Sequence, residues 1–245
     1  MNSPYVYALG FFDGIHPGHR ALLQETCALA KERGARAAVL TFDVHPDGPV
    51  SGKAPRLINT VQERRELIRR FGGIEEILSL PFTEETMCTP WRDFLDGLRE
   101  EHGAVGLVAG YDFRFGHRGE GNGLLMQDYC REHALACRIV PAVAVDGQVV
   151  SSTLIREHYA AGDVAAAARF LGHAPMVMGT ARQGELLRPA GCVSLPDGNY
   201  SAGLEQAGSE GRREVAVSVK DGAFRLPEEL SGPVTLHITA REDRQ

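Results

Sequence analysis

The chain has 245 residues, of which 43% are hydrophobic and 24% are charged, a composition that excludes disordered, collagen-like and coiled-coil proteins. Its apolar stretches are much shorter than the roughly 18 residues of a membrane span, so we expect no contact with a membrane. The net charge of −6 opposes sequence-independent binding of nucleic acid. The first residues hold no basic segment and no cleavage site, which predicts a cytoplasmic protein. The oligomeric state is left open.

Up to about Leu171 the chain alternates short β-rich runs with segments of helical period. This pattern predicts an α/β fold with a parallel sheet covered by helices. Apolar residues at helical spacing, beginning with Leu22 and Leu23, predict an amphipathic helix after the first strand. Two further helices are expected over Thr153–Ala161 and Val164–Leu171. The expected strands are Tyr5–Gly10, Ala35–Phe42, Glu76–Leu80, Gly106–Gly110 and Cys137–Val145.

The stretch Gly172–Pro175 ends this alternation, because glycine and proline interrupt helices and strands. Beyond it, runs rich in β-branched residues lie between turn signals, which is typical of strands. We therefore predict one domain over residues 1–173 and a small all-β domain over residues 174–245. The strands expected in the second domain lie within Pro175–Ala181, Glu214–Val219 and Val234–Ala240.

The first strand runs directly into GFFDGIHPGH, residues 10–19, and the amphipathic helix begins near Gly18. Open α/β sheets bind their ligands at the carboxyl ends of strands, where this segment lies. Gly10, Gly14 and Gly18 allow tight turns and close approach of a ligand. The free N–H groups of the helix start suit a phosphate, and His16 and His19, three residues apart, can face the same ligand. On spacing alone, two solvated or packed histidines are the simpler interpretation.

No metal site is predicted. The Glu of an H-E-x-x-H zinc motif is absent between the two histidines. The five cysteines form no C-x-x-C pair, and their spacings match neither a zinc site nor a disulfide framework. We expect reduced, mostly buried thiols at Cys27, Cys88, Cys130, Cys137 and Cys192.

GFFDGIHPGH resembles the nucleotidyltransferase signature, in the form found in the bacterial FAD synthetases. Three later segments are similar to that family and occur in its order: TFDVHP (Thr41–Pro46), VAGYDFRFG (Val108–Gly116) and SSTLIR (Ser151–Arg156). With the LGHAP junction, the resemblance covers nearly all of residues 5–175. It implies a Rossmann-like nucleotidyltransferase domain, followed by a small barrel-like domain related to the riboflavin kinase domain of bifunctional members.

The resemblance also implies the roles of individual residues. Catalytic roles fall to His16, His19, Ser152, Thr153 and Arg156. Nucleotide contacts fall to Gly10, Phe12, Asp13, Gly14, Gly18, Gly110, Asp112 and Arg114. Flavin contacts fall to Phe42, Pro46 and Arg118.

The residues of the later motifs allow a physical interpretation as well. A hydroxyl of Ser151–Thr153 is expected to cap a helix, with Arg156 one turn on and on the same side. Arginine holds phosphate oxygens bidentately, although a plain serine cap with a solvated arginine fits this segment equally well. The glycine-rich segment 110–123 is either a mobile loop or the wall of a nucleotide or flavin site. Asp43 and His45 are expected to be ordinary loop residues, and Trp91 part of the core.

The resemblance implies transfer of AMP from ATP to FMN, giving FAD and pyrophosphate. The nucleophile is a phosphate monoester with a second pKa near 6, so the reaction needs no general base. Mg²⁺ is the expected partner of ATP, held mainly by phosphate oxygens and water. Two alternatives stay open: a catalytically reduced nucleotide- or flavin-binding paralogue, and a nucleotidyltransferase that acts on another phosphate monoester.

Two departures from the family pattern stand out. Phe11 replaces the small or amide residue usual before Phe-Asp-Gly. The Pro-Thr-Ala-Asn motif of the kinase domain is absent, and the corresponding stretch, residues 184–192, reads GELLRPAGC. The sequence therefore predicts a degenerate or truncated kinase domain without riboflavin kinase activity.

Overall fold

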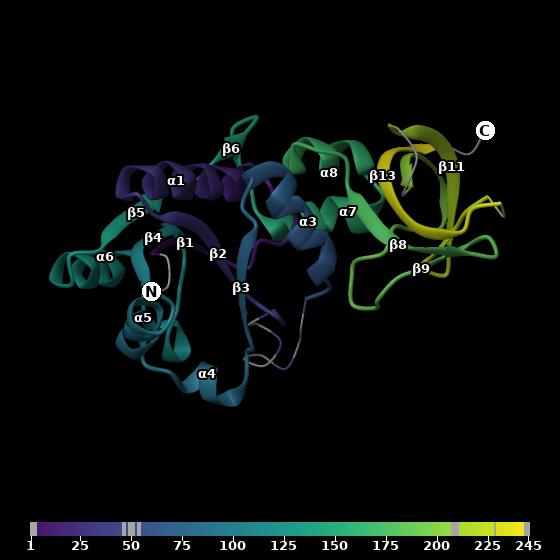
Figure 1. The fold of residues 1–245 in the computed structure, drawn as a ribbon. Coiled ribbons are helices and arrows are strands. Elements are labelled where there is room, and N and C mark those ends of the chain that lie inside the picture. Colours follow the sequence, from purple (N-terminus) through teal and green to yellow (C-terminus); the bar gives the residue numbers. More distant parts are fainter. Residues whose placement is uncertain are drawn as a thin grey trace. The chain divides into compact units, whose positions relative to one another are not determined.

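The computed structural model describes residues 4–45, 48, 52, 55–206, 211–227 and 229–242. The chain forms two compact units (Figure 1). Unit 1 comprises Met1–Pro55 and Leu67–Ala144, and unit 2 comprises Arg56–Glu66 and Val145–Gln245. Helix α3 (Val61–Gly72) contributes its first half to unit 2 and its second half to unit 1.

Unit 1 is built on a five-stranded parallel sheet in the order β3-β2-β1-β4-β5. The predicted α/β class is confirmed, and each predicted strand is present, with small shifts of its ends. The last expected strand ends earlier than predicted, because Pro141 interrupts it, and Ala144–Val145 instead forms β6 of a separate pair with β7 (Gln148–Val149). The sheet strands are β1 (Tyr5–Leu9), β2 (Arg36–Phe42), β3 (Glu76–Leu80), β4 (Ala104–Gly110) and β5 (Ala136–Val140).

Helices cover both faces of this sheet, with α1 (Pro17–Arg33) on one side and α5 (Trp91–Glu100) on the other (Figure 1). The amphipathic first helix is confirmed: Leu22 and Leu23 are buried against the sheet. On the opposite face, α5 and α6 (Gly123–Glu132) pack a cluster that includes Leu95 and Met126. Because both faces are covered, the central strands are continuous apolar runs.

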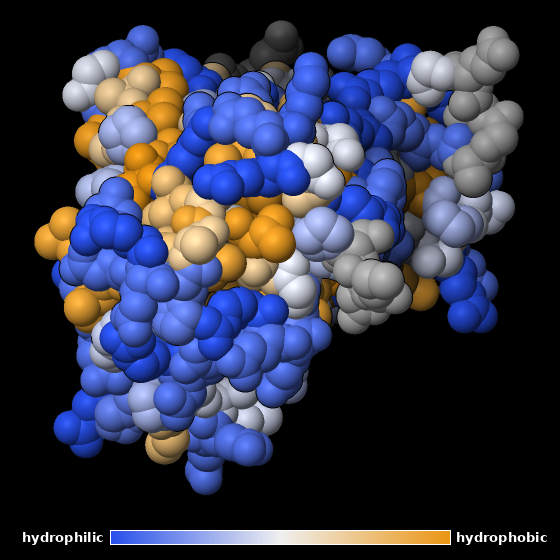
Figure 2. Space-filling view, turned by 60° about the vertical axis from the view of Figure 1, so that its left-hand side comes forward, coloured by the Kyte–Doolittle hydropathy of each residue, from blue (hydrophilic) through white to orange (hydrophobic). Residues whose placement is uncertain are grey.

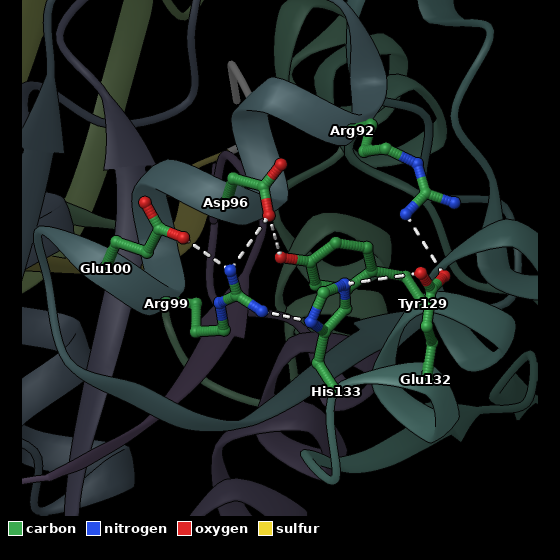
Figure 3. A network of polar contacts seen from close by, with 7 residues as sticks. All are labelled: Arg92, Asp96, Arg99, Glu100, Tyr129, Glu132 and His133. Atoms are coloured by element: carbon green, nitrogen blue, oxygen red, sulfur yellow. Dashed lines mark hydrogen bonds and ion pairs between the residues drawn. The ribbon is translucent and has the colours of Figure 1, made fainter.

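A polar network joins α5 to α6 (Figure 3). The buried Tyr129 donates its hydroxyl to Asp96 Oδ1 at 2.5 Å, and burial raises the pKa of this phenol. Arg99 contacts Asp96, Glu100 and the ring of His133. These contacts link the two helices, so the layer under the sheet is held by polar contacts as well as by its apolar core.

Unit 2 contains a closed antiparallel barrel in the order β10-β11-β12-β9-β8-β13, which confirms the predicted small β domain. Its core includes Tyr200, Ala202 and Leu204, which alternate along β10. Helices α7 (Ser152–Ala161) and α8 (Val164–Leu171) pack against this core through Tyr159 and Val164. The barrel strands are β8 (Met176–Arg182), β9 (Glu185–Leu187), β10 (Gly198–Gln206), β11 (Arg213–Lys220), β12 (Ala223–Arg225) and β13 (Gly232–Glu242).

The two units divide the chain differently from the boundary predicted after residue 173. Helices α7 and α8 and the segment Arg56–Glu66 group with the barrel. A buried ion pair contributes to this grouping: Glu63, which is 0% exposed, accepts from Arg188 at 3.2 Å and from the backbone N–H of Met178 at 2.7 Å. All six barrel strands nevertheless follow residue 173.

The expectation that most thiols are buried was wrong. All five cysteines are free, but Cys130 alone is buried, Cys88 is exposed, and the other three are half-buried. Trp91 is partly buried against the core, as predicted. The face drawn in Figure 2 is largely hydrophilic, with hydrophobic residues gathered in its left half. Among the described residues, no helix has the length and apolarity needed to span a membrane.

Candidate functional site

The topology brings the predicted glycine-rich segments of unit 1 to one edge of the sheet. β1 and β4 are parallel neighbours in register at Leu9 and Ala109, so Gly10, which follows β1, and Gly110, which ends β4, lie at the same edge. In the order β3-β2-β1-β4-β5, the chain crosses from β1 to β2 in one direction and later continues from β4 to β5 in the other. This is the point of an open α/β sheet at which ligands bind.

The loop after β1 has an unusual backbone. Phe12 and Ile15 adopt positive φ angles of 62° and 45°, and Gly14 has a φ of 90°. A β-branched residue with positive φ is an outlier that the surroundings must hold in place. The side chains of Phe12 and Ile15 are fully buried, and Asp13 is 2% exposed. The ring of Phe12, which was predicted to contact the nucleotide, therefore lies in the core.

The two predicted histidines lie together at the start of α1. His16 is the N-cap, and its Nδ1 accepts from the backbone N–H of His19 at 3.4 Å. The imidazole rings stack with their centroids 3.7 Å apart. A Cβ at Gly18 would lie 3.1 Å from the His16 ring, so the glycine leaves room for this arrangement. Capping by an imidazole explains why helix α1 starts here.

Both histidines are neutral at pH 7. Burial, with a smaller effect of the Arg20 charge, lowers the pKa of His16 from 6.5 to about 4. Burial, with the neighbouring His16, lowers the pKa of His19 well below 6.5. Because His16 Nδ1 accepts a hydrogen bond, the proton of the neutral ring lies on Nε2, which can donate to a ligand. The Nδ1 atom of His19 is buried without a hydrogen-bond partner among the described residues.

A pocket of about 820 Å³ opens in unit 1, at the carboxyl ends of β2 and β3. Of the predicted site residues, the structure places Phe42, Arg114 and Arg118 in its lining. The wall is mainly apolar, with two guanidinium groups at exposed positions. The pocket is lined by Phe42, Leu80, Phe82, Thr86, Met87, Cys88, Thr89, Phe94, Arg114, Phe115, Gly116, His117, Arg118 and Gly119.

Hydrogen bonds hold the glycine-rich segment that follows β4. Phe115 and Gly121 exchange two backbone hydrogen bonds of 3.2 and 2.8 Å. His117, in a short 3₁₀ turn (His117–Gly119), contacts the carbonyl oxygen of Met87 in helix α4 (Glu84–Cys88) through Nδ1 at 3.2 Å. Part of this segment, from Arg114 to Gly119, lines the pocket. Asp112 is exposed at the start of the segment.

The third predicted group lies in unit 2, at the start of α7. Ser151 caps the helix by accepting from the backbone N–H of Leu154 at 3.2 Å. Arg156 donates to Thr153 Oγ1 at 3.0 Å, so the expected juxtaposition one turn apart is present. Ser152 is half-buried and Thr153 is exposed. These residues and the histidine pair belong to different units.

Part of the pocket wall was not predicted from the sequence. Phe82 and Thr86–Thr89 were not expected to line a site, although Thr83 and Thr86, which form a capping box at the start of α4, are typical of a helix start. Asp43 lies in the loop after β2, and its Oδ1 accepts from the backbone N–H groups of Val44 and Phe82. Pro46, expected to contact flavin, lies outside the described residues.

Comparison with known proteins identifies the family. The sequence profile of FAD synthetases matches residues 1–154. The bifunctional riboflavin kinase/FMN adenylyltransferases of Listeria monocytogenes and Bacillus subtilis are 30% and 31% identical over 186 residues, which is 74% of this chain and 57% of theirs. A protein named FAD synthetase, also from L. monocytogenes, is 24% identical over 222 residues and 90% of either chain. This chain thus spans little more than half the length of the bifunctional relatives.

The fold has a solved counterpart. A crystal structure described as a macrolide-efflux protein from Streptococcus pneumoniae superposes with a TM-score of 0.86 and 23% identity, over 100% of this chain and 88% of that one. At this identity the likeness shows the two-unit fold alone. The matching profile and the curated relatives confirm the resemblance seen in the sequence, and the chain belongs to the FAD synthetase family.

Proposed function

We propose that this protein transfers AMP from ATP to FMN, which forms FAD and releases pyrophosphate. The observation that carries the proposal is the stacked pair His16 and His19 at the N-terminus of α1, where the order of the sheet reverses. A helix N-terminus with neutral imidazoles offers hydrogen-bond donors to phosphate. The adenylyltransferase names of the bifunctional relatives support the same reaction.

The pocket suits the flavin. Its volume of about 820 Å³ lies within the range of small-molecule sites, and aromatic side chains such as Phe42 and Phe82 offer a flat apolar wall to a ring system. Arg114 and Arg118 supply charge for the phosphate of FMN. Thr41 connects the pocket with the histidine loop, because it precedes Phe42 and donates to the carbonyl oxygen of Phe11 at 3.1 Å.

The chemistry needs positioning and not a base. An oxygen of the FMN phosphate attacks the α-phosphorus of ATP while the bond to the bridging oxygen of the β-phosphate breaks, and the electron pair leaves with pyrophosphate. The FMN phosphate is already largely ionised at pH 7. In this proposal the Nε2–H of His16 donates to the α-phosphoryl oxygens as charge develops, and Ser152, Thr153 and Arg156 bind the triphosphate.

Mg²⁺ enters this scheme as part of the substrate. Among the described residues, no three side chains of His, Cys, Asp or Glu are grouped so as to hold a metal ion. In this proposal the ion is carried by the phosphate oxygens of ATP and by water. The cytoplasmic location and the lack of nucleic-acid binding remain predictions from the sequence.

The test is to incubate the purified protein with ATP, Mg²⁺ and FMN and to measure FAD and pyrophosphate. We expect both products in equal amounts. Nucleotide and FMN binding without product would identify a binding protein, whereas pyrophosphate released only with a different phosphate monoester would identify another acceptor. Either result would contradict the proposal.

A further inference from the structure

Arg20 lies one helical turn after His16, and its contacts connect three parts of unit 1. Its Nε donates to the carbonyl oxygen of Ile15 at 3.3 Å. Its guanidinium lies over the ring of Phe71, in the last turn of α3, with Cζ 3.7 Å from the ring centroid. Stacking on an aromatic face fixes the plane of a guanidinium and therefore the direction of its Nε–H.

The carbonyl that Arg20 holds belongs to the strained part of the loop. Ile15 has a φ of 45° and a fully buried side chain, and the next residue is the capping His16. A conformation of this kind persists only where surrounding groups hold it. Arg20 is such a group, and its position on α1 ties the loop to the helix that the loop caps.

We propose that Arg20 is a positioning residue for the histidine pair: anchored on Phe71, it holds the Ile15 carbonyl and so fixes how His16 and His19 meet the nucleotide. This rests on the proposed adenylyl transfer. Arg20 acts through the loop and does not itself touch the reacting phosphates. The consequence is that the plane of the guanidinium matters as much as its charge.

Three variants separate geometry from charge. Arg20→Gln removes both, Arg20→Lys keeps the charge without the planar fork, and Phe71→Leu removes the aromatic anchor alone. Arg36→Gln is the matched control, because Arg36 also lies over an aromatic ring, that of Tyr5 at the other end of β1. We expect kcat for FAD formation to fall at least ten-fold in the three variants, with little change in the KM for ATP, and the control to match the wild type.

Nuclear magnetic resonance gives a measurement that does not depend on turnover. The Arg20 Nε–H signal should exchange slowly in the wild type and rapidly in Phe71→Leu. The His16 imidazole, identified by its loss in His16→Asn, faces His19 and the Arg20 charge. Its titration should move upward by about half a pH unit in Arg20→Gln, the effect of a unit charge roughly 6 Å away in a water-like dielectric, and stay near the wild-type value in Arg20→Lys.

The outcomes separate this inference from the proposed function. A wild type that forms no FAD contradicts the proposed function, while the exchange and titration data still decide the role of Arg20. An active wild type whose Arg20→Gln variant shows only a higher KM for ATP and an unchanged His16 signal would make Arg20 a ligand contact and overturn the positioning role. Fast exchange of the Nε–H in the wild type would overturn it as well.

Discussion

Replacing His16 separates its capping role from its catalytic role. The imidazole caps α1 through Nδ1 and, in the proposed reaction, donates through Nε2. His16→Asn keeps a side chain that caps well, whereas His16→Ala removes the cap. Both variants remove the donor that faces the nucleotide. The two substitutions should therefore differ in stability and agree in activity.

The magnitudes follow from these two roles. Loss of an N-cap costs about 0.5–2 kcal/mol, so His16→Ala should unfold at a lower urea concentration than His16→Asn. Loss of one preorganised donor to a developing charge lowers turnover by about 10²–10³-fold, equivalent to ~2.7–4 kcal/mol. We expect that loss of kcat in both variants. Asp163→Ala, which removes the cap of α8 in unit 2, is the control for a stability loss without a loss of turnover.

The assay combines urea unfolding followed by circular dichroism with kcat for FAD formation at pH 7.5. Activity is measured at urea-free conditions, where each variant is shown to be folded. Normal turnover by His16→Asn would refute the catalytic assignment. Losses of kcat that merely follow the losses of stability, with Asp163→Ala behaving like His16→Ala, would refute it too.

Four further experiments test the proposed site and reaction. Arg156→Ala should raise the KM for ATP with FMN binding nearly unchanged, while Arg169→Ala on the exposed face of α8 should change neither; equal losses for both substrates would indicate a structural role. The pKa of His16 is about 4 in the fold and 6.5 ordinarily, so the unfolded chain binds more protons between these values. The contribution of neutral His16 to the free energy of unfolding should be complete above pH 6.5, and the free energy should fall by up to about 3 kcal/mol as the pH drops to 4. His16→Asn should lessen this pH dependence, which urea titrations across the range measure. Alkylation of the exposed Cys88 in the pocket should slow when FMN is added, measured by mass spectrometry against Cys88→Ser; an unchanged rate would argue against FMN in this pocket. Riboflavin with ATP and Mg²⁺ should give no FMN, and robust formation would reveal a kinase site absent from this account.

The sheet of unit 1 could be predicted from sequence because its strands are buried on both faces. Val6, Val39 and Val108 are fully buried within apolar runs that only a covered parallel strand requires. The strands of the barrel were harder to predict from the sequence. Strand β10, GNYSAGLEQ, is rich in glycine and small polar residues, and its first two residues, Gly198 and Asn199, are typical of turns. Its pairing with β11 and β13 overrides these weak local preferences.

In the candidate site too, some contacts could be predicted from the sequence and others could not. The contact of His16 with His19 and that of Arg156 with Thr153 each span three residues at the start of a helix, so the spacing in the sequence was compatible with both. The pocket wall around Cys88 and the stacking of Arg20 on Phe71 depend on segments far apart in the chain. The periodicity of a short segment does not predict contacts of this kind, because they form only when distant segments of unit 1 pack together.

Transfer of AMP to FMN is tested most directly by following the phosphorus atoms of ATP into the products. The purified protein is incubated with Mg²⁺, FMN and ATP labelled either at the α-phosphate or at the γ-phosphate, and the products are separated. We expect the α label in FAD and the γ label in pyrophosphate, in equal amounts, with both lost in His16→Asn. Label recovered only in unchanged ATP, or α label in free AMP without FAD, would contradict adenylyl transfer to FMN.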